Sequence, residues 1–274
     1  MGACLSSESD IDPKARDFYR KAVALADSLQ IPFLVGGAFA FNCYTGINRR
    51  TKDFDLFVHP REVPRIMEAF SSVGYRTEIT APHWLGKAFD GEDFIDIIFG
   101  SGKGINDIDD EWFDFAVQEE VLGMRVKLCP PEEIIWSKSY LMERERYDGA
   151  DVAHLLLACG GSLDWERLLR RFGDHWQVLY SHLVLFLFIY PSERKSIPEW
   201  VMRELMGRLE REMALPPTGE KLCRGTLLSK TQYLYDVDRK GFRDARPATS
   251  EIREESMRLQ TKEEVDPAPA GPGA

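Results

Sequence analysis

Two consecutive prolines, Pro130 and Pro131, mark the point at which the hydrophobic pattern of the chain changes. Before them, short apolar runs typical of strands alternate with amphipathic stretches typical of helices. After them, from residue 132 to residue 211, apolar residues recur only at helical spacing. We therefore expect an α+β protein, in which a mixed β-sheet domain is followed by an all-helical domain.

The same pattern predicts the bounds of the domains and their elements. We expect the sheet domain at residues 1–129, a helical domain with a docked C-terminal segment at 130–246, and a disordered tail at 247–274. Strands are expected at residues 33–35, 54–58, 75–79, 84–89, 94–99 and 125–128. Helices are expected at residues 13–29, 38–44, 62–73, 134–146, 149–158, 163–172, 175–189 and 198–211.

The charge balance limits the classes of partner. The 274 residues include 45 acidic and 35 basic side chains, so the formal net charge is −10. This balance argues against broad nonspecific binding of nucleic acid, which depends on neutralising phosphates. The sequence has no apolar stretch of about 18 residues and no secretory signal, and its five cysteines form no CxxC motif. We expect a cytoplasmic protein with no stable membrane association.

The first six residues offer one alternative to that expectation. They match the N-myristoylation pattern, with Gly2 as the acceptor and Cys4 as a second residue that could be acylated. The residues that follow are acidic, which weakens a second membrane signal. The choice is therefore between a lipid-anchored protein and an unmodified N-terminus.

Two acids stand inside one apolar run, in the sequence Asp53-Phe54-Asp55-Leu56. Strand side chains alternate between faces, so Asp53 and Asp55 share one face of the predicted strand. Two carboxylates a few ångströms apart repel by about 4 kcal/mol at an effective dielectric constant near 20, and a hard divalent cation such as Mg²⁺ reverses that sign. The other pairs with this spacing are expected to be solvated surface: Asp107 with Asp109, Glu143 with Glu145, and Asp236 with Asp238.

A third acid, Asp96, lies among five large apolar residues in the run from 94 to 99. An aspartate inside such a strand is costly unless it is paired or bound to a metal ion. We expect Asp96 to be a third metal ligand. The alternatives are a carboxylate that faces solvent and one that forms a salt bridge with an arginine.

A glycine pair, Gly36-Gly37, lies between the expected strand at 33–35 and the expected helix at 38–44. Such a turn presents backbone N–H groups and a helix N-terminus, which suit a phosphate. An ordinary tight turn is the alternative.

Together these motifs resemble the DNA polymerase β-like nucleotidyltransferase superfamily. The family pattern is a strand, Gly-Gly or Gly-Ser, a short helix, Asp-hydrophobic-Asp on the next strand, and a third acid on a later strand. The residue pattern Arg-x-Thr-x-Asp-x-Asp is most similar to that of the bacterial AbiEii-like and antibiotic-modifying branches. The matching residues are Val35-Gly36-Gly37, Arg49-Arg50-Thr51-Lys52-Asp53-Phe54-Asp55 and Ile95-Asp96-Ile97.

The resemblance implies transfer of a nucleoside monophosphate from an NTP, such as ATP, to an acceptor hydroxyl. Two Mg²⁺ ions, or Mn²⁺ in their place, would be the cofactors. Asp53 and Asp55 would hold both ions, and Asp96 would complete the site of the ion that activates the acceptor. The nucleotide would be bound by Gly36, Gly37 and Lys138.

The resemblance leaves the acceptor open. It could be RNA, a protein hydroxyl as in toxin–antitoxin systems, or a cationic small molecule, which the net charge of −10 favours. The alternative function is a catalytically silent interaction protein of the same fold, such as a toxin–antitoxin component. Silent members usually lose an acid, and all three acids are present here.

Charged residues beyond the motifs have two interpretations each. Lys138, on a predicted helix, either reaches a phosphate or is an exposed helix lysine. The charge-dense segment 144–151 resembles part of the AbiEii-like helical half, and we interpret it as a salt-bridge cluster that joins the two domains, in preference to an acceptor-binding patch.

Four further cations lie near the acids. We interpret Arg49, Arg50 and Lys52 as solvated loop charges, although they could also contact phosphate or an acidic acceptor. Lys87, on the strand expected beside that of Asp96, either borders the site or only compensates the acids.

The histidines have no spacing that suits zinc, so no zinc site is expected. His154 and His182 fall in apolar helices and are interpreted as core or boundary groups. The tryptophans on amphipathic faces, which are expected in the core, are Trp112, Trp136, Trp165 and Trp176.

Overall fold

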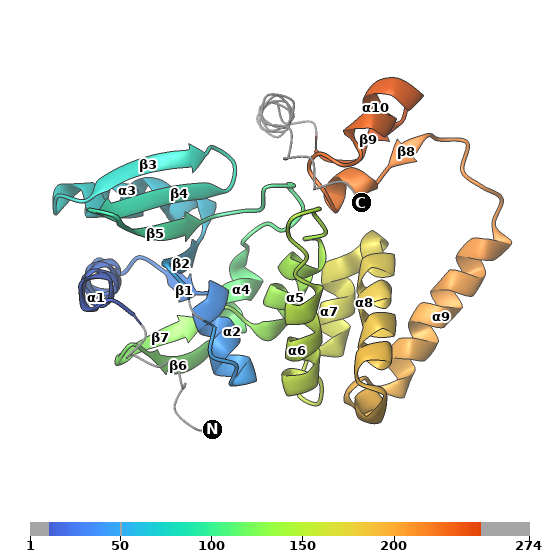
Figure 1. Cartoon of the computed structure of the whole chain (residues 1–274), viewed down its shortest axis with the longest axis horizontal. Coiled ribbons are helices and arrows are strands. Elements are labelled where there is room, and N and C mark those ends of the chain that lie inside the picture. Colours follow the sequence, from blue (N-terminus) through green and yellow to red (C-terminus); the bar gives the residue numbers. More distant parts are fainter. Residues whose placement is uncertain (1–10, 50, 248–274) are drawn as a thin grey trace, which may run out of the picture.

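The computed structural model describes residues 11–49 and 51–247. A seven-stranded mixed sheet occupies one side, and a group of helices occupies the other (Figure 1). The strand order is β3-β4-β5-β2-β1-β7-β6. The strands are β1 (Phe33–Val35), β2 (Asp53–Val58), β3 (Arg76–Ala81), β4 (Leu85–Asp90), β5 (Asp93–Ile98), β6 (Val117–Val121) and β7 (Met124–Leu128).

The centre of the sheet is built on β2, which pairs antiparallel with β1 and parallel with β5. Its even positions, Phe54, Leu56 and Val58, are fully buried, and its odd positions are half-buried. This is the alternation expected of a strand with one face on a hydrophobic core. The ring of Phe54 stacks on Tyr19 of α1 (Pro13–Ser28), with centroids 5.0 Å apart. The face with the even positions is thus closed, and the acids lie on the other face.

Three helices of nine residues or more lie among the sheet strands along the chain. Helix α1 begins as the sequence predicts, because the Asp12 side chain accepts a hydrogen bond from the Lys14 N–H at 2.8 Å and Pro13 is the first helical residue. It packs on α3 (Val63–Ser72). Helix α2 (Gly37–Thr45) follows β1 directly and packs on both β2 and α6 (Gly149–Cys159), so it lies between the sheet and the helical half.

The helical half follows the double proline. It contains a buried ionic cluster, in which Arg167 binds Glu132 at 2.6 Å and also Glu133. Arg171 extends the cluster to Asp109 at 2.6 Å, so the helices are tied to a segment of the sheet half. The predicted core tryptophans are all buried, at 8% exposure or less. The helices are α5 (Pro131–Ser139), α6, α7 (Trp165–Phe172), α8 (Trp176–Ile189) and α9 (Glu199–Ala214).

The C-terminal segment returns to the middle of the molecule (Figure 1). Buried Lys103, from the loop after β5, donates to the carbonyl of Tyr140 at 2.6 Å and to that of Leu228. The carboxylate of Glu143 accepts from the Lys230 N–H at 3.0 Å. The segment contains β8 (Leu222–Cys223), α10 (Leu234–Lys240) and β9 (Arg243–Asp244); short 3₁₀ turns occur at Pro60–Glu62, Gly173–His175, Pro191–Ser196 and Gly225–Leu227.

The predicted α+β class is confirmed, but the predicted helix at 134–146 is wrong beyond Ser139. The backbone groups that would continue it are used elsewhere: the Tyr140 carbonyl accepts from Lys103, and the Met142 N–H donates to Leu228 at 3.1 Å. Met142 instead forms an isolated β-bridge with Tyr147. Partners far away in sequence therefore end this helix.

Two elements of the sheet half were not predicted, namely α4 (Asp110–Asp114) and the edge strand β6. The turn from β6 to β7 places Leu122 and Gly123 at φ of 53° and 73°, a left-handed pair typical of a two-residue hairpin. Gly123 was the signal for it. In the described part of the chain no helix is both long and apolar enough to cross a membrane. The expectations for the N-terminal acylation pattern and for residues 248–274 lie outside the described residues.

Candidate active site

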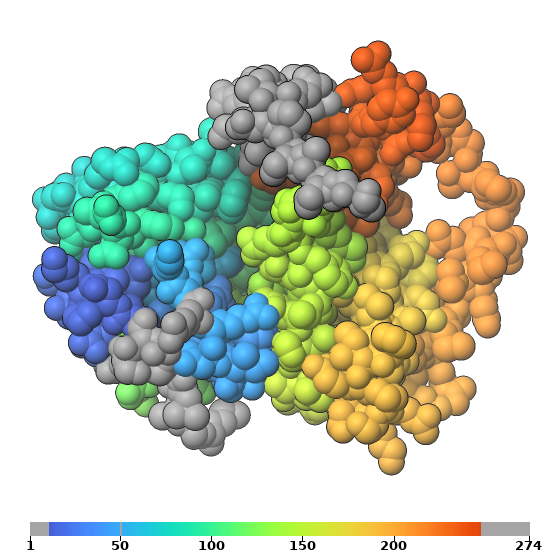
Figure 2. Space-filling model, viewed as in Figure 1, coloured from blue at the N-terminus to red at the C-terminus, as the bar shows by residue number. Residues whose placement is uncertain are grey.

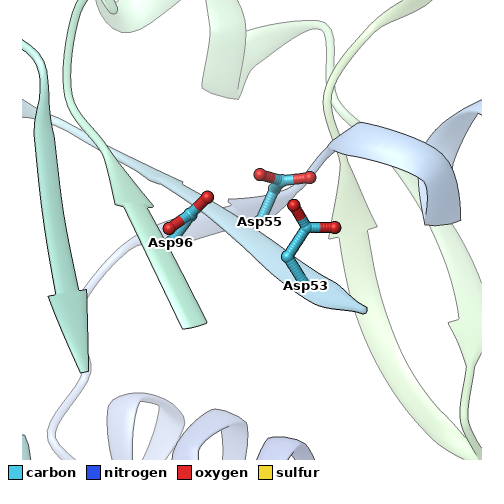
Figure 3. Close-up of side chains that lie close together, drawn as sticks. All are labelled: Asp53, Asp55 and Asp96. Carbon is cyan, nitrogen blue, oxygen red and sulfur yellow. The ribbon is translucent and has the colours of Figure 1, made fainter. Parts of the chain in front are cut away.

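Three aspartates gather on the open face of the sheet. The parallel pairing of β2 with β5 places Asp55 directly opposite Asp96, and Asp53 lies two residues earlier on the same face of β2. One carboxylate oxygen of each residue lies within 4.8 Å of the other two (Figure 3). Among the described residues, no other group of three His, Cys, Asp or Glu side chains meets this criterion. The structure thus brings together the three acids that the sequence singled out.

Burial and neighbouring negative charge raise the pKa values of Asp55 and Asp96. Burial, together with the negative charges of Asp53 and Asp96, raises the pKa of Asp55 to about 7. Burial also raises the pKa of Asp96, although the hydrogen bond from Lys87 opposes this. In the absence of a cation, the site therefore disfavours the ionised form of Asp55. A divalent cation among the three oxygens would remove this cost, and carboxylate oxygens are the ligands that Mg²⁺ prefers.

Both glycines of the Gly36-Gly37 pair are required by close approaches. Gly37 is the first residue of α2, has a φ of 54°, and leaves no room for a side chain, since a Cβ there would lie 1.6 Å from Oδ2 of Asp55. A Cβ on Gly36 would lie 2.2 Å from the ring of Phe57. The Gly36 N–H donates to the carbonyl of Asp55 at 3.0 Å. The N-terminus of α2 therefore lies directly beside the acid cluster.

Three polar side chains hold the segment that leads into β2. Sequence reasoning missed Tyr19 and Asn42, and it named Thr51 only as part of the motif. Buried Asn42 of α2 donates to the Arg49 carbonyl at 3.2 Å and accepts from the Arg49 N–H at 3.0 Å. Tyr19 donates to the carbonyl of Lys52 at 3.2 Å, and the Thr51 hydroxyl contacts the Asp53 carboxylate. An asparagine in an otherwise apolar helix was the signal that could have identified the first contact.

Two of the cations near the acid cluster form ion pairs, and a third is exposed. Lys87 forms an ion pair with Asp96, so it borders the acid cluster. Arg49 forms an ion pair with Asp151 of α6 and lies over the ring of Phe41, with its guanidinium carbon 4.4 Å from the centroid. It is therefore not a free loop charge. Lys52 is exposed, and Arg50 lies outside the described residues.

Lys138 lies at the end of α5, where Asp148 and Asp151 hold its ammonium group at 2.7 and 2.8 Å. Arg146 also binds Asp148, at 3.0 Å. The positive charges of Lys138 and Arg146 partly oppose the rise in the pKa of Asp55, so both are close enough to act on the acid cluster. The segment 144–151 thus forms a salt-bridge cluster, as interpreted from the sequence, and Arg49 links it to the sheet half.

The three histidines His59, His154 and His182 contact groups outside the cluster of Asp53, Asp55 and Asp96. His182 is buried, with Nε2 3.0 Å from the carbonyl of Ser139, and His154 contacts the ring of Phe41 edge-on. His59 packs against Phe113 and has Nε2 3.2 Å from Asp110. Burial lowers the pKa of His182 below its ordinary value, which fits the structural role predicted for it.

No family model matches the sequence, and no curated protein matches it. Among solved structures, the antibiotic-resistance factor ANT(2'')-Ia is similar at 20% identity and a TM-score of 0.46, over 63% of this chain and 98% of that one. The lincosamide antibiotic adenylyltransferase LnuA is similar at 15% identity and a TM-score of 0.38, over 53% of this chain and 96% of that one.

A third similar structure is an antigenic nucleotidyltransferase-like protein from Paracoccidioides brasiliensis. It shares 17% identity at a TM-score of 0.37, over 65% of this chain and 93% of that one. At such identities and TM-scores, we infer the chemistry of this chain from its own residues.

Replacing Gly37 by alanine tests the close approach to Asp55. Gly37→Ala places a methyl group where the Asp55 carboxylate lies, so we expect loss of the thermal stabilisation that Mn²⁺ and NTP confer on the wild type. Gly46→Ala is the matched control, because Gly46 also has a positive φ, of 70°, but a Cβ there meets nothing within 4 Å. Retained stabilisation in Gly37→Ala, or equal loss in both variants, contradicts the assignment.

Metal binding should strengthen with pH. Because the pKa of Asp55 is raised to about 7, the metal-free folded protein holds this proton more tightly than the unfolded chain, and the stability gained from it is lost as pH rises through 7. A cation must displace the same proton, so its affinity should rise roughly tenfold from pH 6 to pH 8. Calorimetric titration with Mn²⁺ at both pH values measures this. An affinity independent of pH contradicts it, and Asp55→Asn should flatten the dependence.

Proposed function

We propose that this protein is a divalent-cation-dependent nucleotidyltransferase that moves a nucleoside monophosphate from an NTP, such as ATP, to an acceptor hydroxyl. The observation that carries the proposal is the convergence of three aspartate oxygens within 4.8 Å on two paired strands, beside a helix N-terminus. In such a transfer, the acceptor oxygen forms a bond to the α-phosphorus while the bond to pyrophosphate breaks. The protein's task is mainly to position the reactants and to balance their charge.

The donor set suits Mg²⁺, and Mn²⁺ as a substitute. All three groups are carboxylates, and Lys87 forms an ion pair with Asp96 at the edge of the cluster. Asp53 and Asp55 would hold two ions, and Asp96 would complete the site on the acceptor side. When bound, the ions supply charge neutralisation on the triphosphate and lower the pKa of the acceptor hydroxyl.

The nucleotide would lie between α2 and the end of α5. The first turn of α2, which begins at Gly37 beside Asp55, would offer backbone N–H groups to triphosphate oxygens. Lys138 supports the same placement from the other side, because its charge acts on Asp55 while Asp148 and Asp151 hold the ammonium in position. As a compact cation, it would contact phosphate as a point charge.

For the acceptor, the net charge of −10 favours a cationic small molecule over RNA, because a negative field repels phosphates. RNA and protein hydroxyls, the latter as in toxin–antitoxin systems, are the other acceptor classes to be tested. A cytoplasmic setting, which supplies both NTP and Mg²⁺, belongs to the proposal.

The test incubates the protein with each labelled NTP, with Mg²⁺ or Mn²⁺, and with cationic antibiotics, host RNA or lysate proteins. We expect pyrophosphate release and label transfer to one acceptor class, and loss of both in Asp53→Asn and Asp96→Asn. Asp107→Asn, which alters an exposed acid outside the cluster, should keep wild-type activity.

Two outcomes separate the alternatives. Metal-dependent NTP binding without transfer to any acceptor would point to a catalytically silent interaction protein. Neither binding nor transfer would overturn the proposed function, as would full activity in Asp53→Asn.

A further inference from the structure

Helix α8 is apolar on every side, yet one side faces solvent. Residues 176–190 contain no Asp, Glu, Lys or Arg. The inner side is buried through residues such as Leu179, Leu183 and Phe186. A helix that is apolar all round is normally buried all round. On the outer side, four apolar residues at helical spacing are exposed by 41–83%. We call them the α8 face: Val184, Leu185, Phe188 and Ile189.

Helix α9 also exposes large apolar side chains. It packs against α8 but buries only Val201 and Leu205 fully. Met206 and Met213 lie on one side of α9, two turns apart, and are exposed by 48% and 77%. Single exposed apolar residues are normal on protein surfaces, but large apolar side chains gathered on two neighbouring helices mark an interaction site.

The charge of this region favours a second copy of the same chain as the partner. Residues 176–215 contain five acidic and five basic side chains, so they are neutral, whereas the whole chain carries −10. Within α9, arginines also pair with glutamates, as in Arg208 with Glu204 at 2.8 Å. The rest of the chain carries the whole net charge of −10, so two copies should repel each other least through this neutral region, where apolar surface is available.

We propose that the α8 face is the interface of a two-fold symmetric homodimer. In such an interface each copy presents the same patch to the other, so a neutral, apolar patch is self-complementary. The α8 and α9 helices lie on the side of the molecule away from the sheet that carries the aspartates (Figure 2). Dimerisation therefore leaves the acid cluster accessible, and it is independent of the proposed catalytic function.

Sedimentation velocity of the full chain, from nanomolar to tens of micromolar protein, tests the proposal. We expect the wild type to sediment with the mass of two chains and Phe188→Glu with the mass of one. Leu185→Lys is a second variant on the α8 face, with the same expected result. Because both side chains are exposed, the variants should keep the wild-type unfolding temperature measured under conditions where the protein is monomeric.

Ile79→Glu is the matched control, since Ile79 is exposed by 46% on the edge strand β3, on the sheet side of the molecule. It should remain dimeric. A wild type that is monomeric at every concentration overturns the proposal. A dimer that survives both Phe188→Glu and Leu185→Lys, or one that Ile79→Glu dissociates, overturns the placement of the interface.

Discussion

The repulsion among three carboxylates on paired strands is the constraint on which the rest of this site depends. Parallel pairing places Asp55 opposite Asp96, and the two-residue period of the strand adds Asp53 to the same face. Burial, together with the negative charges of Asp53 and Asp96, raises the pKa of Asp55 to about 7, so the metal-free site disfavours the ionised form of this acid. A fold that keeps such a cluster half-buried on its open face retains a destabilising feature, which a bound cation converts into binding energy.

The surrounding structure holds the acids in this arrangement and prevents them from separating. Gly37 admits the Asp55 carboxylate against the start of α2, and Asn42 and Thr51 hold the segment that leads into β2. Cations stand at the periphery, with Lys87 on Asp96 and Lys138 held by the acids of α6. Charge is therefore distributed as a triphosphate complex requires, with acids at the centre and positive groups outside.

Much of this could be predicted from local pattern. The alternation in Asp53-Phe54-Asp55-Leu56 indicates a shared face, and the apolar surroundings of Asp96 indicate a second costly acid. The register that sets Asp55 against Asp96 could not be predicted, because it depends on pairing between strands that are distant in sequence. The end of α5 at Ser139 depends in the same way on Lys103 and Leu228, whose contacts replace helical hydrogen bonds. The roles of Tyr19 and Asn42 likewise become visible only in three dimensions.

The proposed function requires a cation to bind among the three aspartates. Crystals grown with Mn²⁺ and a non-hydrolysable NTP analogue, measured at the manganese absorption edge, locate bound metal directly through its anomalous scattering. We expect anomalous peaks between the carboxylates of Asp53, Asp55 and Asp96, with the triphosphate reaching toward Gly36 and Gly37. Bound analogue with no peak among these carboxylates, or manganese only at other acidic groups, would contradict the central claim.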